Sequence, residues 1–468
     1  MPVSRLALLS LTCLLAGCHV GGSSPPPLPS QSSETSLGLL APDQRNEPAS
    51  FVQPAAFVEE ADEPLPEPVA VAPLDATTTP LTLEQLEQMA LTANPSIAEA
   101  RARVEAVRGK WIQVGLPPNT FVGYSGQQLG SGGTAEQQGL FVGQEFVRGN
   151  KLQLNRAVAA QEVQQTEQLL AVQQQRVITD VRLAFYDVLV AQRRSALAKE
   201  LVTIAQQAIQ TAEALLRAKE VSQVDVMRAR IELQSAQLAQ KNAENLHVAA
   251  WSRLTAVLGH ESLPRRDLTG DLERTLEAIN PDEVIARLVS ESPEMAAALT
   301  DVERARWAVN RAHAEPIPNI DVQAVVQSDN GTGSSNANLQ VSMPIPWLNR
   351  NQGGIRQAHA EVVAAERAVD RLEFSFKQRL ATVYQRYANA RNQVVDYSKE
   401  GGILANSRTT LDFVRRAYQA GELNYLDLIT AQRTFSQTNL AYIESLGELW
   451  AAIVEIDGML LKGSLEGR

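Results

Sequence analysis

The feature that most restricts the fold of this 468-residue chain is an internal duplication with a period of about 200 residues. Four landmarks recur in the same order. Their offsets lie between 198 and 202 residues. Residues 93–97 correspond to 291–295, residues 116–119 to 316–319, and residues 217–226 to 419–428. The pair Trp251 and Gly259 corresponds to Trp450 and Gly458. This repetition predicts two equivalent units joined in tandem.

Both units show the same order of expected elements: a short helix, a long helix, a strand, a turn, a strand, a very long helix, a break and a further helix. Residues 150–258 contain no Gly or Pro, and a helix over residues 151–218 would be about 100 Å long. Apolar residues at heptad spacing predict seams for neighbouring helices. They are Val177, Val181, Ala184, Val188 and Ala191 in the first unit, and Leu380, Val383, Tyr387 and Ala390 in the second.

Two strand pairs interrupt the helices at equivalent points. We expect strands over residues 120–129 and 139–147, and over 320–328 and 338–345, each pair joined by a turn rich in Gly. Apolar and polar residues alternate most clearly over residues 339–345, where the apolar positions are Leu339, Val341, Met343 and Ile345 and the polar ones include Gln340 and Ser342. Such alternation suits a soluble hairpin as well as a membrane barrel strand. Four strands cannot close a barrel, so strands that enter lipid require an oligomer.

The first residues resemble a bacterial lipoprotein signal. One positive charge precedes the apolar residues 6–15, and Leu15-Ala16-Gly17-Cys18 resembles a lipobox. This predicts a signal peptide over residues 1–17 and lipidation of Cys18; an ordinary signal peptide with an incidental cysteine is the alternative. His19 stands where an inner-membrane retention signal places Asp, which favours the outer membrane.

Residues 18–80 have the composition of a disordered tether. They hold 12 of the 23 prolines and a net charge of −8 out of −11 for the chain. The remainder is close to neutral, which argues against nucleic acid as a partner.

Side chains that could support catalysis or hold a metal are sparse. The two cysteines, Cys13 and Cys18, both lie in the signal region, and five histidines are scattered: His19, His247, His260, His313 and His359. A metal site built from them requires residues distant in sequence to meet, so we expect no metal and no cofactor. No nucleophile–base pair or phosphate loop is evident, and we do not expect an enzyme.

Together, the duplicated unit, the Asn94-Pro95 and Ser292-Pro293 breaks and the turn at residues 420–427 resemble the TolC family of outer-membrane channel proteins, in its lipoprotein branch. The resemblance covers residues 81–461. It implies a mainly α fold with a membrane β-barrel portion: a homotrimer with a hollow α-barrel and a shared twelve-stranded β-barrel. Prolines 117, 118, 316, 318, 344 and 346 then fall between strands and helices.

The resemblance also implies domains, partners and activity. Two efflux repeats are expected over residues 81–262 and 280–461, with a linker over 263–279 and a tail over 462–468. The chain is expected to act with a periplasmic adaptor protein and an inner-membrane pump, as a passive conduit that carries small molecules or metal ions across the periplasm and outer membrane. A type I protein-secretion channel, or a lipid-anchored periplasmic scaffold without a pore, remains as an alternative.

By the same resemblance, two turns form the periplasmic helix tips that close the tunnel and meet the adaptor. The residues concerned are Lys219, Glu220, Val221 and Ser222 in the first unit and Gly421, Glu422, Leu423 and Asn424 in the second. In the first unit Lys219 stands where the second unit has the tip glycine. Leu423 stands where some members of the family carry a basic gate residue. Asp225 and Asp427 are candidates for a pore constriction. They also fit a helix-capping role, because each lies three residues after an N-cap residue, and the two roles are compatible.

Overall fold

The computed structural model describes residues 81–130, 132, 136–260, 263–274 and 278–466. The chain divides into units of residues 1–75 and 76–468, and all described residues belong to the second. The predicted signal peptide, Cys18 and the tether lie outside the described residues.

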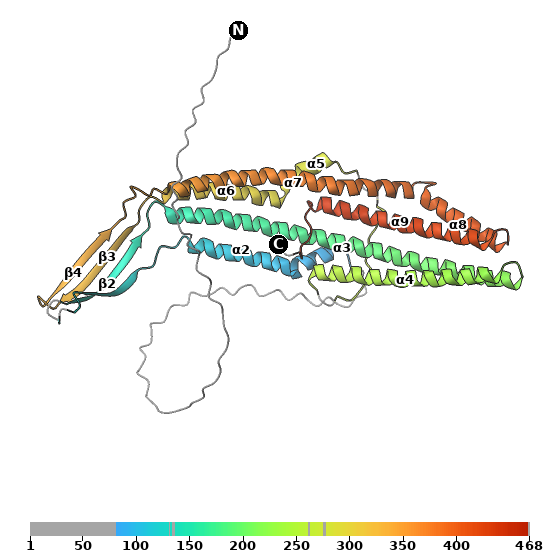
Figure 1. Ribbon diagram of the computed structural model, residues 1–468, viewed down its shortest axis with the longest axis horizontal. Helices are drawn as coiled ribbons and strands as arrows, with labels where there is room; N and C mark the ends of the chain where they lie inside the picture. Colours follow the sequence, from blue (N-terminus) through green and yellow to red (C-terminus); the bar gives the residue numbers. More distant parts are fainter. Residues whose placement is uncertain (1–80, 131, 133–135, 261–262, 275–277, 467–468) are drawn as a thin grey trace, which may run out of the picture. The chain divides into compact units, whose positions relative to one another are not determined.

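Helices dominate the described chain, and a four-stranded sheet lies at one end of them (Figure 1). The first copy contains α1 (Leu83–Ala93), α2 (Pro95–Gln113), β1 (Phe121–Gln127), β2 (Gln137–Phe146), α3 (Lys151–Arg217) and α4 (Gln223–Leu258). The second copy contains α5 (Pro281–Glu291), α6 (Pro293–Ala314), β3 (Ile320–Asp329), β4 (Ser334–Ser342), α7 (Gln352–Ser398), α8 (Ile403–Gln419) and α9 (Tyr425–Asp457). The predicted order of elements is therefore confirmed, with two corrections given below.

The same local chemistry starts the equivalent helices of both copies. Asn94 accepts a hydrogen bond from the Ser96 backbone N–H, and Ser292 accepts one from that of Glu294, with a proline at the first helical position in both cases. The long helices α3 and α7 both begin after an asparagine in the left-handed region, which asparagine tolerates better than most residues. The duplication thus extends to backbone geometry.

Four helices lead into four strands in the same spatial order. In the half nearest the sheet, contacts place the helices as α2–α3–α6–α7, and the sheet order is β1–β2–β3–β4 with every pair antiparallel. In the other half the order is α4–α3–α9, with α7 and then α8 beyond α9 (Figure 1). Along one edge of this helical layer lie α2 and α4, and along the other edge lie α7 and α8.

The heptad seams pack as predicted. Val177, Val181 and Val188 are buried in a cluster with α1 and α4, and Leu380, Val383 and Tyr387 are buried in the equivalent cluster with α5 and α9. Two tryptophans hold the linker that follows the first copy: the indole N–H of Trp251 donates to the Leu263 carbonyl, and that of Trp450 donates to the Leu272 carbonyl.

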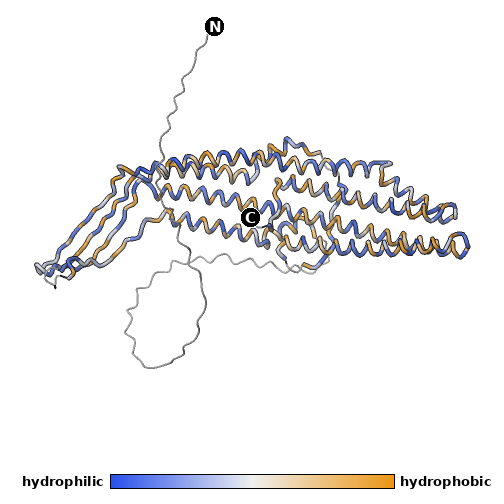
Figure 2. The backbone as a smooth tube through the Cα atoms, in the orientation of Figure 1, coloured by the Kyte–Doolittle hydropathy of each residue, from blue (hydrophilic) through white to orange (hydrophobic). Residues whose placement is uncertain are grey.

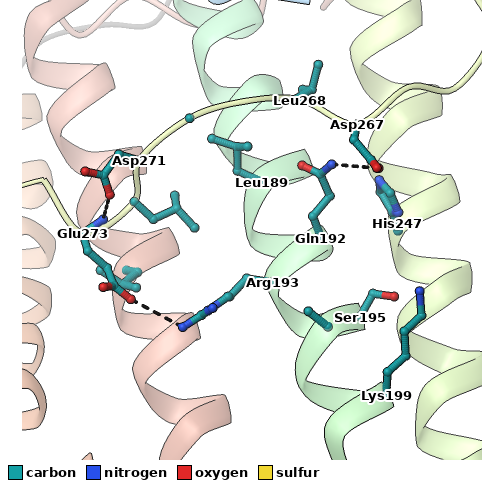
Figure 3. Close-up of a pocket in the computed structure, with 14 residues that line it drawn as sticks. Leu189, Gln192, Arg193, Ser195, Lys199, His247, Asp267, Leu268, Asp271 and Glu273 are labelled. Atoms are coloured by element: carbon teal, nitrogen blue, oxygen red, sulfur yellow. Dashed lines mark hydrogen bonds and ion pairs between the residues drawn. The ribbon is translucent and has the colours of Figure 1, made fainter. Parts of the chain in front are cut away.

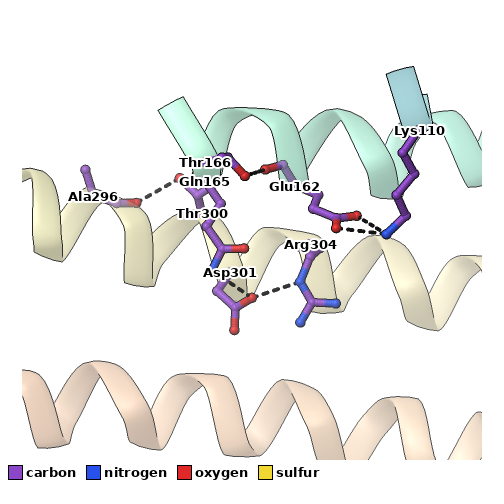
Figure 4. Close-up of polar contacts among 8 residues, drawn as sticks. All are labelled: Lys110, Glu162, Gln165, Thr166, Ala296, Thr300, Asp301 and Arg304. Carbon is purple, nitrogen blue, oxygen red and sulfur yellow. Dashed lines mark hydrogen bonds and ion pairs between the residues drawn. The ribbon is translucent and has the colours of Figure 1, made fainter. Parts of the chain in front are cut away.

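The two copies also meet through polar contacts between α3 and α6. The Asp301 carboxylate of α6 accepts hydrogen bonds from Gln165 of α3, at 3.2 Å, and from Arg304, at 2.8 Å (Figure 4). On the other side of α3, Lys110 of α2 pairs with Glu162 at 2.6 Å. These contacts fix the neighbours of α3 where it approaches the sheet.

Two sequence predictions were wrong in detail. The second copy does not contain one very long helix: it breaks after Ser398, where Gly401 adopts a φ of +67° that favours glycine, and α8 starts at Ile403. The strand predicted over residues 338–345 instead runs from Ser334 to Ser342. Pro344 and Pro346 lack the N–H groups that a continued strand needs.

None of the described helices is long and apolar enough to cross a bilayer, and polar and apolar residues alternate closely along the helices (Figure 2).

Candidate functional site

The four-stranded sheet has one apolar and one polar face. Successive residues along a strand point to opposite faces of the sheet, and residues paired across neighbouring strands point to the same face. The strand register therefore assigns each residue to one of the two faces. One face carries Val122, Tyr124, Leu140, Val142, Val322, Ala324, Val326, Ala337, Leu339 and Val341. The opposite face carries Ser125, Gln127, Gln137, Glu145, Asp321, Gln323, Gln327, Asp329, Asn336, Asn338, Gln340 and Ser342. The exceptions are Gln138, Gln144, Ser328 and Ser335 on the first face and Phe121, Phe141 and Val325 on the second, so the faces are predominantly apolar and predominantly polar along all four strands.

Most of the apolar face is exposed in the single chain. Val122, Leu140 and Leu339 have 79, 70 and 71% of their surface accessible. An apolar surface that spans a whole sheet indicates a partner that excludes water. The sheet order leaves β1 and β4 as edge strands, each with one row of backbone groups facing away from the sheet.

Two aromatic rings lie on the polar face. Phe121 and Phe141 pack edge to face with 6.1 Å between ring centroids. They occupy the space above Gly143 and Gly123, where an added Cβ would come within 2.3 and 2.5 Å of the rings. The glycines thus make room for the aromatic pair on an otherwise hydrophilic surface.

The first helix tip is the turn between α3 and α4. Lys219 has a φ of +66°, so it adopts the left-handed conformation that its twin Gly421 adopts at +77°. This confirms a turn that the sequence of the first copy alone did not indicate. Ser222 caps α4: its side chain accepts from the Asp225 backbone N–H, and the Asp225 carboxylate accepts from the Ser222 backbone N–H at 3.2 Å and hydroxyl at 2.7 Å. The capping role of Asp225 is confirmed.

The second tip differs from the first. Asn424 caps α9 by accepting from the Asp427 backbone N–H at 3.1 Å. Within the described chain, the Asp427 carboxylate forms no hydrogen bond or ion pair, whereas Asp225 also lies 3.6 Å from Arg228. Asp427 therefore does not take the reciprocal capping role that Asp225 has: Asn424 alone supplies the cap of α9, and no serine hydroxyl is present to bind the carboxylate.

A buried tyrosine pair holds the two tips together. Tyr418 at the end of α8 and Tyr425 at the start of α9 lie edge to face, 5.9 Å between ring centroids, inside a cluster that includes Val226 of α4 and Ala212 of α3. Both hydroxyls are buried without a hydrogen-bond partner among the described residues. Burial raises the pKa of both phenols, and the nearby Asp225 carboxylate raises the pKa of each further.

Most of the tip residues predicted to meet a partner are exposed. Lys219, Glu220, Ser222, Gly421, Glu422, Leu423 and Asn424 are exposed, while Val221, Asp225 and Asp427 are partly buried. The two turns lie together at the end of the helices farthest from the sheet (Figure 1).

A cavity of about 640 Å³ lies between α3, α4, α9 and the linker at residues 263–274. Gln192 and Lys199 of α3, His247 of α4 and Asp267 of the linker line it (Figure 3). The Gln192 amide donates to Asp267 at 3.2 Å, and burial followed by the charge of Arg265 lowers the pKa of His247. Sequence reasoning gave no indication of this cavity, because its walls come from four separate segments.

No group of three or more His, Cys, Asp or Glu side chains suited to a metal ion occurs in the part of the chain that the structure describes. Two of the scattered histidines nevertheless meet: the rings of His313 and His359 lie 5.9 Å apart. The two histidines are 46 residues apart in the sequence and lie on different helices, so the sequence does not predict this contact.

Comparison with known proteins identifies the family. The family profile described as outer membrane efflux protein matches residues 86–260 and again 284–460. The chain belongs to this family. It is therefore an outer-membrane efflux channel component of tripartite systems, a class of conduits and not a class of enzymes. The two matches correspond to the two copies recognised from the landmarks.

Individual relatives agree with this assignment. The chain is 25% identical over 394 residues to the cobalt-zinc-cadmium resistance protein CzcC of Cupriavidus metallidurans, covering 84% of this chain and 92% of the relative. The fold is similar to that of the outer-membrane channel OprN, with a TM-score of 0.67, 20% identity and coverage of 89 and 100% of the two chains. It is also similar to the open state of the MtrE channel of Neisseria gonorrhoeae, with a TM-score of 0.66, 19% identity and coverage of 81 and 89%.

Proposed function

We propose that three copies of this efflux protein close into one channel, in which the sheets form a shared twelve-stranded barrel in the outer membrane. The observation that carries this proposal is the two-faced sheet with free edges at β1 and β4. Edge pairing between copies satisfies both rows of backbone groups. The apolar face then contacts lipid, and the face rich in Gln and Asn lines an aqueous pore.

The helical layer supports the same assembly. Its edge helix α4 exposes Val224, Met227, Ile231 and Leu238 along one side, at the spacing of a helix seam. At the opposite edge, Ile403 and Phe413 of α8 are exposed. Packing α4 of one copy against α8 of the next covers both apolar edges and closes the layers into a hollow α-barrel.

The helix tips form the periplasmic entrance in this arrangement. The exposed turn residues 219–222 and 421–424 contact the adaptor protein, and a ring of carboxylates narrows the tunnel. Asp427 is the better candidate for that ring, because its carboxylate has no hydrogen-bond or ion-pair partner in the described chain. Asp225 contributes mainly to the start of α4.

The remaining assignments rest on the sequence. Cleavage before Cys18 and its lipidation anchor the chain to the outer membrane, and residues 18–80 tether the anchor to the two repeats at 81–262 and 280–461. Residues 263–279 link the repeats and residues 462–468 form the tail. The trimer works with a periplasmic adaptor and an inner-membrane pump that selects the cargo.

We propose small molecules or metal ions as that cargo, with divalent metal cations first. The support is the relation to a cobalt-zinc-cadmium resistance protein along most of both chains. Deletion of the gene in its own host should lower the tolerated concentration of cobalt, zinc or cadmium, and the intact gene should restore it. Unchanged metal tolerance, with increased sensitivity to an organic compound, would redirect the cargo assignment without affecting the channel.

The channel itself is tested with the purified, detergent-solubilised protein. We expect a trimer that dissociates on heating and gives single-channel conductance in a planar bilayer. A monomer without conductance would refute the proposal and favour a periplasmic scaffold.

A further inference from the structure

Two histidines from different helices meet on the surface of the second copy. His313 lies in the last turn of α6 and His359 in the second turn of α7, and both side chains are exposed. Their rings lie 5.9 Å apart between centroids, at an interplanar angle of 76°. From this pair we propose that His313 and His359 form a two-imidazole binding site for a borderline divalent metal cation of the zinc, cobalt and nickel class.

The distance between the rings suits joint coordination of one ion. A Zn–N bond of about 2.1 Å and roughly 1.1 Å from nitrogen to ring centre place an ion about 3.2 Å from each centroid. At a tetrahedral angle, two such rings have centroids about 5 Å apart. The observed separation of 5.9 Å is about 1 Å longer than this value, so joint coordination requires the two exposed rings to turn toward each other.

The helices that carry the pair are held firmly against each other. Ala314 and Ala358, the neighbours of the two histidines, are both buried. The Asn351 side-chain amide at the start of α7 donates to the Ala312 carbonyl at 2.8 Å. Farther along, Val302, Ala305 and Ala365 form a buried cluster between the same two helices. Ligands on rigid, packed elements lose little freedom when they bind an ion.

The surrounding chemistry limits which ions fit. Imidazole suits zinc, cobalt, nickel and copper better than calcium or magnesium, which require oxygen ligands. Since the described chain supplies no third His, Cys, Asp or Glu to this group, water completes the coordination. Nearby Glu315 already pairs with Arg311. We therefore expect a site that exchanges its ion readily, in contrast to a closed structural zinc site.

The first copy lacks this site. The offset of the Pro118 and Pro318 landmarks aligns His313 with Gln113, and the matching asparagines Asn150 and Asn351 align His359 with Val158. The duplication therefore shows that this position of the fold does not need imidazoles for its structure, which makes substitution of either histidine a suitable test.

The test uses full-length protein purified without a polyhistidine tag, titrated with Zn²⁺ by calorimetry and with Co²⁺ by visible absorption. We expect saturable binding of one ion per chain. H313Q, which copies the first repeat, and H359Q should each weaken binding by roughly tenfold or more, since loss of even an outer-shell partner costs 10–100-fold. H260Q removes an unrelated histidine and should leave binding unchanged.

Three results would overturn the proposal: no saturable Zn²⁺ binding by the unsubstituted chain, an affinity in H313Q and H359Q that equals that of the unsubstituted chain, or a loss of affinity in H260Q as large as in those two variants. If the rings only pack against each other, both variants will lower the unfolding temperature and leave Zn²⁺ binding intact, which also refutes the site. The single-channel conductance of H313Q and H359Q should equal that of the unsubstituted protein. This inference therefore stands or falls independently of the proposed channel.

Discussion

The separation of the sheet into two faces leads to a sharp prediction at adjacent residues of β4. Leu339 and Gln340 follow each other in the middle of the strand and point to opposite faces, where they pair with Ala324 and Gln323 of β3. Leu339 is 71% exposed in the single chain. In the proposed barrel it contacts lipid, and Gln340 faces the pore. Arginine at these two positions should therefore have very different effects.

The expected magnitude follows from the position of Leu339 near the middle of the strand. An arginine on the lipid face of a barrel costs about 2–4 kcal/mol at the bilayer midplane. At 1.4 kcal/mol per factor of ten, this corresponds to roughly a 30- to 700-fold shift in the insertion equilibrium for each chain. A trimer carries three copies, so the assembled barrel is destabilised by about 6–12 kcal/mol. Leu339→Arg should abolish assembly, whereas Gln340→Arg should preserve it.

The assay is the amount of heat-dissociable trimer in the outer-membrane fraction on unheated gels. Leu339→Ala separates the loss of the leucine from the arrival of a charge and should retain most of the trimer. Gln340→Arg should assemble normally but reduce the conductance for cations, because the added charge repels them within the pore. Equal trimer levels for L339R and Q340R, or a larger loss in Q340R, would refute the assignment of the two faces.

Three further predictions concern the helix tips and the cavity. Lys219→Gly should raise the unfolding free energy by about 1 kcal/mol, because it removes a lysine from a left-handed conformation. Gly421→Ala should lower the unfolding free energy by a similar amount in denaturant titrations. A fall for Lys219→Gly or a rise for Gly421→Ala would contradict the turn geometry. Ser222→Ala should cost about 1 kcal/mol through loss of the α4 cap, while an unchanged denaturation midpoint would contradict the capping box. Burial lowers the pKa of His247 below its ordinary 6.5, so the unfolded chain binds the proton first and the unfolding free energy should fall as pH drops below 6.5. His247→Gln should flatten this dependence of the unfolding free energy on pH. The same pH profile in His247→Gln as in the unsubstituted protein would show that His247 does not cause it.

Local patterns and the duplication were sufficient to predict most of the element order. Gly- and Pro-free runs predicted α3 and α4, and proline positions marked the transitions between helices and strands. The left-handed turn at Lys219 became visible only through its twin Gly421, because lysine itself carries no turn signal. The break at residues 399–402 was missed although Gly401-Gly402 is a turn signal, since the first copy continues its helix unbroken through the equivalent region.

Contacts between distant segments could not be predicted in this way. The cavity beside His247 and the meeting of His313 with His359 both depend on which helices become neighbours. Heptad spacing indicates that a helix has a seam, but it does not name the helix that covers the seam. The layer order α4–α3–α9–α8 therefore had to come from the structure.

The two tips show how duplicated sequences can diverge in role while they keep one backbone. At the first tip Ser222 and Asp225 bind each other reciprocally, so one oxygen of the carboxylate serves the start of α4. At the second tip Asn424 caps the helix alone, and the carboxylate of Asp427 remains without a partner in the described chain. A carboxylate engaged in a cap is held in place and partly neutralised, whereas an unpaired one keeps its charge and freedom to bind a cation. In the proposed channel, the charge of a constriction would therefore come mainly from Asp427 at the second tip, whereas Asp225 at the first tip serves mainly to start α4.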